Sequence, residues 1–132
     1  MISSGSCLCK LVRFKVDGEL LRFYTCHCSR CQKETGSAFA SNLFLPIDSI
    51  EWIAGRDDIT RFEYSEAQSF CSDFCSKCGS RIPYLSRNGE FYIVPAGSLD
   101  GTPELKATAR IFWKDPEHLE RALDALRRAG LQ

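Results

Sequence analysis

The chain has 132 residues, a length typical of one domain, and 44% of them are hydrophobic, enough for a modest core. Lysine plus arginine number 17, as do aspartate plus glutamate, so the formal net charge is zero. This balance argues against nucleic acid or an anionic membrane as a partner. No apolar run approaches the roughly 18 residues of a membrane span, and Met1 to Ser6 lack the features of a secretory signal. We therefore expect a cytoplasmic protein with a single domain over residues 1–132.

The first part of the chain predicts a β-hairpin. Residues 12–16 alternate between apolar and charged side chains, which is the period of a half-buried strand. Asp17-Gly18 follows, a dipeptide favoured in two-residue hairpin turns, and residues 21–24 alternate again as the return strand. Such a hairpin would bring Cys9 on one arm to the same end as Cys26 on the other.

The rest of the chain predicts a mainly β fold. Further segments with the pattern of strands are 39–45, 50–53, 59–64, 68–74, 81–85, 91–94 and 109–113. Turn signals separate them at Pro46-Ile47-Asp48, Gly55-Arg56-Asp57-Asp58, Asn88-Gly89 and 97–103. Many short strands with regular turns are typical of an all-β domain.

One segment near the end of the chain, residues 115–129, predicts a C-terminal α-helix. Asp115 can act as its N-cap and Pro116 suits the first helical position. An apolar stripe runs along one face, and Gly130 ends the segment. We expect this helix to cover part of the β core, and a partner-binding helix is the alternative.

The eight cysteines are clustered, in the stretches Cys7-Leu8-Cys9, Cys26-His27-Cys28-Ser29-Arg30-Cys31 and Cys71 with Cys75 and Cys78. A disulfide joins Cα atoms about 5.5 Å apart with a demanding dihedral, so a C-x-C pair closes one only with strain. A metal ion instead gathers several thiolates around one point, with each sulfur at roughly 2.3 Å. The clustering therefore predicts metal binding rather than a disulfide framework.

Two cysteine pairs far apart in the sequence predict a closed structural zinc site. Cys7 and Cys9 supply two thiolates, and Cys75-Ser76-Lys77-Cys78-Gly79 is a zinc knuckle in which Gly79 lets the backbone turn behind the ion. Four thiolates complete a tetrahedron, so the two segments would have to meet. Such a site contributes directly to the stability of a small domain.

The middle cluster, Cys26, Cys28 and Cys31, offers three thiolates and predicts an open catalytic zinc site. Three protein ligands leave the fourth corner to water or substrate, and a thiol placed there would be held as thiolate. Two alternatives remain, because Cys71 or His27 could supply the fourth ligand. His27 lies between two ligand positions, so its side chain should point away, and Cys71 could equally be a buried strand residue.

The sequence does not favour a serine–histidine or cysteine–histidine nucleophile system, because the chain contains only two histidines. The candidates for an acid–base group are Glu34, a neighbouring carboxylate, His27 and metal-bound water. Glu34 could equally be a solvated surface residue.

The motifs together indicate a family. The matching stretches are Gly5-Ser6-Cys7-Leu8-Cys9, Cys26-His27-Cys28-Ser29-Arg30-Cys31-Gln32-Lys33, Gly36-Ser37-Ala38-Phe39 and Phe74-Cys75-Ser76-Lys77-Cys78-Gly79-Ser80. In this order they resemble the glutathione-dependent formaldehyde-activating enzyme (GFA) family, from about residue 3 to residue 113. Centromere protein V shares this domain.

The resemblance implies a zinc-binding β-tent of small packed antiparallel sheets, also seen in methionine sulfoxide reductase B. It implies two zinc ions per chain, a structural one on Cys7, Cys9, Cys75 and Cys78 and a catalytic one on Cys26, Cys28 and Cys31. The implied reaction adds glutathione to formaldehyde to give S-hydroxymethylglutathione, a carbon–sulfur lyase reaction in reverse. Cations for the two glutathione carboxylates could come from Arg30, Lys33, Arg81, Arg87 or Lys106.

Three functions are compatible with these motifs. The first is a carbon–sulfur lyase-like enzyme acting on the thiol adduct of a small aldehyde, with a small-molecule thiol such as glutathione as its substrate. The second is a non-catalytic, zinc-stabilised module that binds a protein, and the third is a thiol redox or metal-sensing protein. No motif indicates an oligomeric state.

Overall fold

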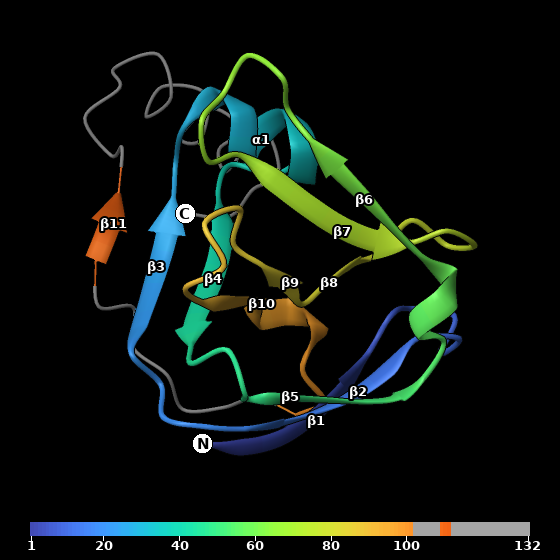
Figure 1. Ribbon diagram of the computed structural model, residues 1–132. Coiled ribbons are helices and arrows are strands. Elements are labelled where there is room, and N and C mark those ends of the chain that lie inside the picture. Colours follow the sequence, from blue (N-terminus) through green and yellow to red (C-terminus); the bar gives the residue numbers. More distant parts are fainter. Residues whose placement is uncertain (102–108, 112–132) are drawn as a thin grey trace, which may run out of the picture.

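The computed structural model describes residues 1–101 and 109–111, which form three β-sheets and one α-helix (Figure 1). The first sheet has the order β1 (Ile2–Ser6), β2 (Arg13–Asp17), β5 (Ile50–Ala54). The second has the order β11 (Ala109–Ile111), β3 (Arg22–Cys26), β4 (Ala40–Leu45), β10 (Tyr92–Pro95), β9 (Tyr84–Leu85). The third has the order β6 (Ile59–Glu63), β7 (Cys71–Cys75), β8 (Arg81–Ile82). The helix is α1 (Ser29–Thr35), and short 3₁₀ turns are η1 (Arg56–Asp58) and η2 (Ala96–Ser98).

The sheets face one another like the sides of a triangle (Figure 1). Among the described residues, every strand pair is antiparallel except β11 with β3, which run parallel. The helix α1 lies at the end of β3, beside the start of β7 (Figure 1). The described part of the chain is thus mainly β, built from small sheets, which confirms the predicted fold class at that level.

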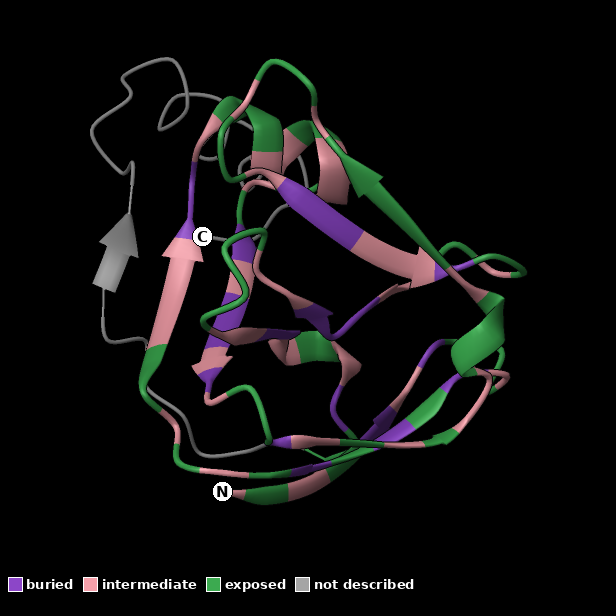
Figure 2. Ribbon diagram, in the orientation of Figure 1, coloured by how far each residue is buried: buried purple, intermediate pink, exposed green. Residues whose placement is uncertain are grey.

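The main core lies between the first and second sheets. Phe14 and Val16 of β2 point inward and pack with Leu43, Leu45 and Val94 of the second sheet, and all five are at most 1% exposed. The alternation predicted for β2 is seen in its buried and exposed residues (Figure 2). Removal of this apolar surface from water is the main stabilising contribution that the described core makes.

The predicted hairpin at Asp17-Gly18 is wrong. The strand β2 pairs with β1 on one side and β5 on the other, so neither of its edges is open to β3. The backbone N–H of Asp17 donates to Ser49 O at 2.9 Å and that of Gly18 to Met1 O at 3.0 Å, which directs the chain into the second sheet. There β3 pairs with β4, so Cys9, in the turn between β1 and β2 of the first sheet, is not brought to the end of β3 where Cys26 lies.

Most of the other predicted strands are present with shifted ends, and one is divided. The segment 81–85 forms two short strands, β8 and β9, which belong to different sheets. Pro83 separates them and has no N–H to donate to a ladder, so one continuous strand is disfavoured there. The turn predicted at Asn88-Gly89 joins β9 to β10, with Gly89 at a φ of 75°.

The helix α1 was not predicted. Its backbone is capped by Cys28 at the N-terminus and by Gly36, with a φ of 64°, at the C-terminus. It has no buried residue and so no apolar stripe to reveal it. The predicted C-terminal helix at 115–129 lies outside the described residues, and no helix within them has the length and apolar character of a membrane span.

Replacing Gly5 with alanine should destabilise the fold. A Cβ at this position would lie 2.4 Å from Cζ of Phe14 and 2.5 Å from the backbone O of Ser98. We expect Gly5→Ala to lower the free energy of unfolding by about 2 kcal/mol, as for other overpacked sites. Urea unfolding would measure it, with Gly97→Ala as control because nothing lies within 4 Å of a Cβ there. Equal stability of the two variants would contradict the packing described here.

Candidate metal centres

The first cysteine cluster brings four sulfur atoms together from two distant segments. The Sγ atoms of Cys7, Cys9, Cys75 and Cys78 all lie within 4.8 Å of one another. Two of the separations are 3.6 Å, from Cys7 to Cys9, and 3.9 Å, from Cys9 to Cys75. A tetrahedral ion with sulfur at about 2.3 Å requires sulfur atoms about 3.8 Å apart, whereas a disulfide requires about 2 Å. The cluster therefore fits a four-thiolate metal site.

Two tight turns place these sulfurs. After β1, the Cys7 N–H donates to Val12 O at 3.0 Å, and Lys10 adopts a φ of 64° within the turn. The Val12 N–H donates to Cys7 Sγ at 3.3 Å. After β7, the Gly79 N–H donates to Cys75 O at 2.8 Å with Gly79 at a φ of 75°. Both turns direct the thiol groups to one point, as the knuckle sequence predicts.

Ser80 connects the two turns. Its Oγ accepts a hydrogen bond from the Leu8 N–H at 3.1 Å and lies 3.2 Å from Cys78 Sγ. This contact with Ser80 lowers the pKa of Cys78 to about 5. A thiolate is the form that binds a metal, so Ser80 supports the metal-ligating state of Cys78.

The second cluster is local, because its three cysteines lie within the six residues 26–31. Cys26 ends β3, Cys28 is the N-cap of α1 and Cys31 is in its first turn. The three Sγ atoms lie within 4.8 Å of one another. The Cys31 N–H donates to Cys28 Sγ at 3.3 Å, which fixes the orientation of that side chain. These three sulfurs can hold a metal ion from one side.

The crowded thiols of this cluster affect one another's protonation. A hydrogen bond with the Cys31 side chain lowers the pKa of Cys26 to about 6. The same interaction, together with burial, raises the pKa of Cys31 above its ordinary value. One thiol therefore ionises readily while its neighbour keeps its proton, and a bound cation would allow both to ionise.

The structure places neither alternative fourth ligand with these three sulfurs. His27 is 4% exposed, its Nε2 lies 3.2 Å from Thr25 Oγ1, and its ring packs at 5.1 Å from that of Phe39. Cys71 in β7 is buried, and the Arg61 side chain donates to its Sγ at 3.4 Å. Among the described residues, the set of mutually close ligand atoms at this cluster contains only the three cysteines.

A pocket of about 640 Å³ opens beside the second cluster. All three cysteines line it, and so does Cys71, which packs with Tyr84 and Ile93. Its apolar surface comes from the second sheet, the segment before β10 and the segment before β7, namely Phe44, Tyr84, Ile93, Phe91 and Phe70. A molecule in this pocket would meet the sulfurs on one side and an aromatic surface on the other.

The positively charged side chains near this pocket have different roles. Arg81 Nε and Glu34 Oε2 are an ion pair at 2.8 Å, although their alignment is not that of a hydrogen bond. Arg87 Nη1 donates to the carbonyls of Tyr64 and Ala67 at 3.0 and 2.8 Å, which anchors the loop between β6 and β7. Both arginines therefore have structural partners.

The other charged residues proposed from the sequence differ in their position relative to this pocket. Glu34, the candidate acid–base residue, is held by Arg81 and does not line the pocket beside the second cluster. Arg30 does line that pocket, and its guanidinium lies 5.3 Å from the centroid of the Tyr64 ring. Lys33 is on α1 outside the pocket lining, and Lys106 lies outside the described residues.

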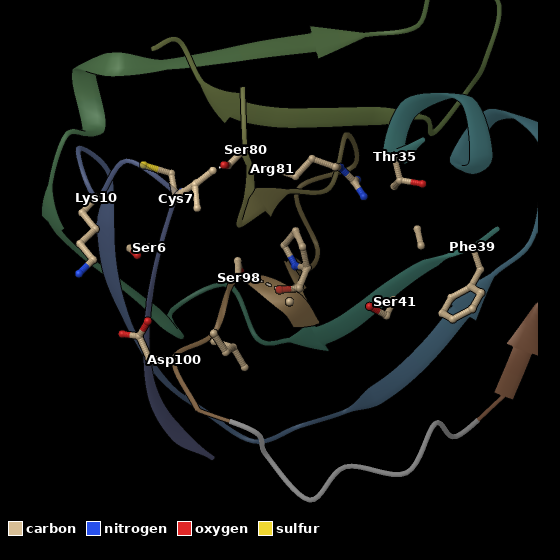
Figure 3. A pocket seen from close by; sticks show the side chains of 15 residues that line it. Ser6, Cys7, Lys10, Thr35, Phe39, Ser41, Ser80, Arg81, Ser98 and Asp100 are labelled. Carbon is tan, nitrogen blue, oxygen red and sulfur yellow. Dashed lines mark hydrogen bonds between the residues drawn. The ribbon is translucent and has the colours of Figure 1, made fainter. Parts of the chain in front are cut away.

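A different pocket of about 540 Å³ lies on the side of the first cluster (Figure 3). Cys7 and Ser80 lie at one end, and Thr35 and Phe39 at the other (Figure 3). None of the three cysteines of the second cluster lines it. Its lining is rich in serine hydroxyls, and we find no grouping there that resembles a reaction centre among the described residues.

Comparison with known proteins identifies the family. The model of the glutathione-dependent formaldehyde-activating enzyme family matches residues 2–115, a span that includes both cysteine clusters. The chain belongs to the GFA family. A crystal structure of a Rhodobacter sphaeroides protein, a structural genomics target, shares the fold with a TM-score of 0.63 at 22% sequence identity. That match covers 81% of this chain and 98% of the other. No curated protein matches the chain.

Several polar residues of the pocket in this GFA-family chain were not anticipated from the sequence, and two of them are buried. Asn42 lies in the middle of β4 and Tyr84 in β9, and both line the pocket beside the second cluster. Neither belongs to a motif. The sequence pattern of β4 could have indicated Asn42, because this polar residue interrupts a largely apolar strand. Its side chain is 8% exposed.

Substitution of single cysteines should distinguish the cysteines that bind a metal ion from Cys71, which we expect not to bind one. We expect wild-type protein to bind two metal ions per chain, Cys28→Ser to bind one, and Cys71→Ser to keep both, because Cys71 is not among the close sulfurs. Elemental analysis by mass spectrometry after gel filtration measures these ratios. Loss of an ion from Cys71→Ser would show that Cys71 completes the second site, contrary to this arrangement.

Proposed function

We propose that this GFA-family chain is a zinc-dependent enzyme of the carbon–sulfur lyase type. Its proposed reaction is the reversible addition of glutathione, or a similar thiol, to formaldehyde. The observation that carries the proposal is a cluster of three sulfurs that opens onto a 640 Å³ pocket, without a fourth protein ligand among the described residues. Family membership supports the choice of reaction and of substrate.

Zinc is the proposed metal at both clusters. Thiolate-only ligand sets select zinc among the common divalent ions, and the sulfur separations of the first cluster suit its tetrahedral radius. We assign the structural ion to Cys7, Cys9, Cys75 and Cys78, and the catalytic ion to Cys26, Cys28 and Cys31. A zinc ion with three protein ligands accepts a substrate thiol in its fourth position and favours the thiolate form.

The protein residues contribute position and surroundings. The pocket holds the two reactants next to each other, which replaces an encounter in solution by an oriented one. Phe44, Phe91 and Ile93 form a wall that limits water around the reacting atoms. The sulfurs are accessible from the pocket, because Cys28 and Cys31 are only partly buried.

Exchange NMR provides a direct test of this function. Wild-type protein with two bound zinc ions should accelerate the interconversion of glutathione plus formaldehyde with S-hydroxymethylglutathione. We expect Cys28→Ser to lose at least about 100-fold of that acceleration, since loss of even an outer-shell contact to a metal ligand costs 10- to 100-fold. Cys71→Ser is the matched control and should retain activity. Two bound zinc ions with no acceleration in the wild type would favour the protein-binding module instead.

Arg30 is the pocket cation best placed for a substrate carboxylate. Among the described residues it makes no ion pair, unlike Arg81 and Arg87, and its contact is with the face of the Tyr64 ring. It is exposed at the pocket, so an anionic thiol can reach it. We therefore assign a glutathione carboxylate to Arg30.

Removal of this cation should weaken binding of charged thiols only. We expect Arg30→Ala to raise the KM for glutathione about fivefold with kcat unchanged, the effect of one partly exposed ion pair. With 2-mercaptoethanol, which has no carboxylate, the two proteins should have the same KM. Lys33→Ala, on the same helix but outside the pocket, is the control. An equal KM increase for both thiols would rule out the assigned ion pair.

A further inference from the structure

Asn42 is a buried polar residue whose acceptor has no partner. Its side chain is 8% exposed, and Oδ1 makes no hydrogen bond within the described part of the chain. An unpaired buried acceptor costs about 1–3 kcal/mol, and native proteins rarely leave one without a ligand or an ordered water. Asn42 lines the pocket beside the second cluster, so a donor for this oxygen can come from a molecule bound there.

The strand register places Asn42 next to the second cluster. On β4, Asn42 is opposite Tyr24 of β3, and Ala40 is opposite Cys26. Residues directly opposite in an antiparallel pair share a face, as do residues two apart on one strand. Asn42 and Cys26 are therefore diagonal neighbours on one face of the sheet, a relationship that typically separates Cα atoms by about 7–8 Å.

Tyr84 lies on the same face of the sheet, on the edge strand β9. It is opposite Ile93 of β10, which in turn is opposite Phe44, two residues from Asn42 on β4. Tyr84 is 7% exposed, and the Arg81 guanidinium lies 5.9 Å from the centroid of its ring. Its hydroxyl makes no hydrogen bond to any described residue, although it lines the pocket.

The Tyr84 hydroxyl remains a donor at neutral pH. Burial raises the pKa of this phenol above its ordinary value, and the Arg81 charge offsets only part of that effect. Its O–H is therefore present over the working range of pH. The pocket thus offers a hydrogen-bond acceptor at Asn42 and a donor at Tyr84, on the sheet face that also carries Phe44 and Ile93.

We propose that Asn42 and Tyr84 together recognise the hydroxyl group of an S-hydroxyalkyl thiol adduct. Asn42 Oδ1 accepts a hydrogen bond from the adduct hydroxyl, and the Tyr84 hydroxyl donates a hydrogen bond to the oxygen of that group. A hydroxyl group is both donor and acceptor, whereas a thioether without it leaves both partners unpaired. This inference rests on the proposed function, since it identifies the residues that select the adduct at that site.

The two residues act at different stages of the chemistry, because Tyr84 can donate to the oxygen throughout, whereas Asn42 Oδ1 can accept a hydrogen bond only when that oxygen carries a proton. In addition, the sulfur electron pair forms the C–S bond, the C–O π pair moves to oxygen, and that oxygen takes the proton that the thiol has lost. The Tyr84 hydrogen bond stabilises the negative charge that develops on oxygen. In breakdown the hydroxyl loses its proton, the carbonyl forms again, and the C–S bonding pair returns to sulfur. Atoms and electrons balance without an oxidant or reductant.

Two variants and two probes test the proposal with the zinc-loaded protein. The probes are S-hydroxymethylglutathione, kept in an equilibrated glutathione–formaldehyde solution, and S-methylglutathione, which has no hydroxyl. Ligand-observed NMR would give the Kd of each. We expect Asn42→Leu to weaken binding of the hydroxymethyl compound about tenfold, and Tyr84→Phe about fivefold, with S-methylglutathione unchanged. Tyr84→Phe keeps the buried ring, and metal content confirms that each variant is folded.

The outcomes separate this inference from the proposed function. A loss confined to the hydroxymethyl probe supports the inference. If the wild type accelerates the reaction but both variants keep its preference for that probe, the inference is overturned and the function stands; Asn42 then binds a structural water only. Equal losses for both probes also overturn it, because they indicate a disturbed pocket. If the wild type neither binds the probes nor accelerates the reaction, both the inference and the function fail.

Discussion

Four sulfur atoms that must meet at one point are the constraint on which the rest of the fold depends. Cys9 and Cys75 are 66 positions apart, yet their Sγ atoms lie 3.9 Å from each other. The turn after β1 and the turn after β7 therefore have a fixed relation, and with them the first and third sheets. Val12 and Ile82 are fully buried and pack with Cys7 and Cys75 in a small apolar core, whereas Cys9 is exposed at its surface. A chain of 132 residues buries limited apolar surface, and metal binding there would add directly to its stability.

The cysteine clusters could be predicted from the sequence, whereas the pairing of the strands could not. The cysteine spacings predicted which sulfurs gather, because two ligands within a turn are brought together by the turn itself. The strand β1 was missed because Ile2–Ser6 has no apolar alternation. Its stability comes from pairing with β2 and from the close approach of Gly5 to Phe14, which are tertiary features. Once β1 is omitted, β2 has an open edge, and the Asp17-Gly18 turn was then misinterpreted as a hairpin.

The pocket shows the same division between local and tertiary information. Cys26, Cys28 and Cys31 could be identified from six residues, but Asn42 and Tyr84 meet the cluster only through the register of β3, β4, β10 and β9. The arginines illustrate it as well, since all of them carry the same charge in the sequence. Only the fold shows that Arg81 forms an ion pair with Glu34 and that Arg87 donates hydrogen bonds to loop carbonyls. It also shows that Arg30 is exposed at the pocket.

The two clusters differ in how many chain segments they join, and this difference gives a physical reason for their different proposed roles. A site built from two distant turns is closed by folding, because both segments are needed to complete the tetrahedron. A site built from six consecutive residues at the start of α1 has its three ligands on one side of the ion. The other side of the ion then faces the surrounding protein or solvent. Here the pocket that the three cysteines line is also lined by residues of β4, β9 and β10. Because these residues and the sulfurs come from different segments, substrate recognition can change by substitution in the sheet while the metal ligands stay in place.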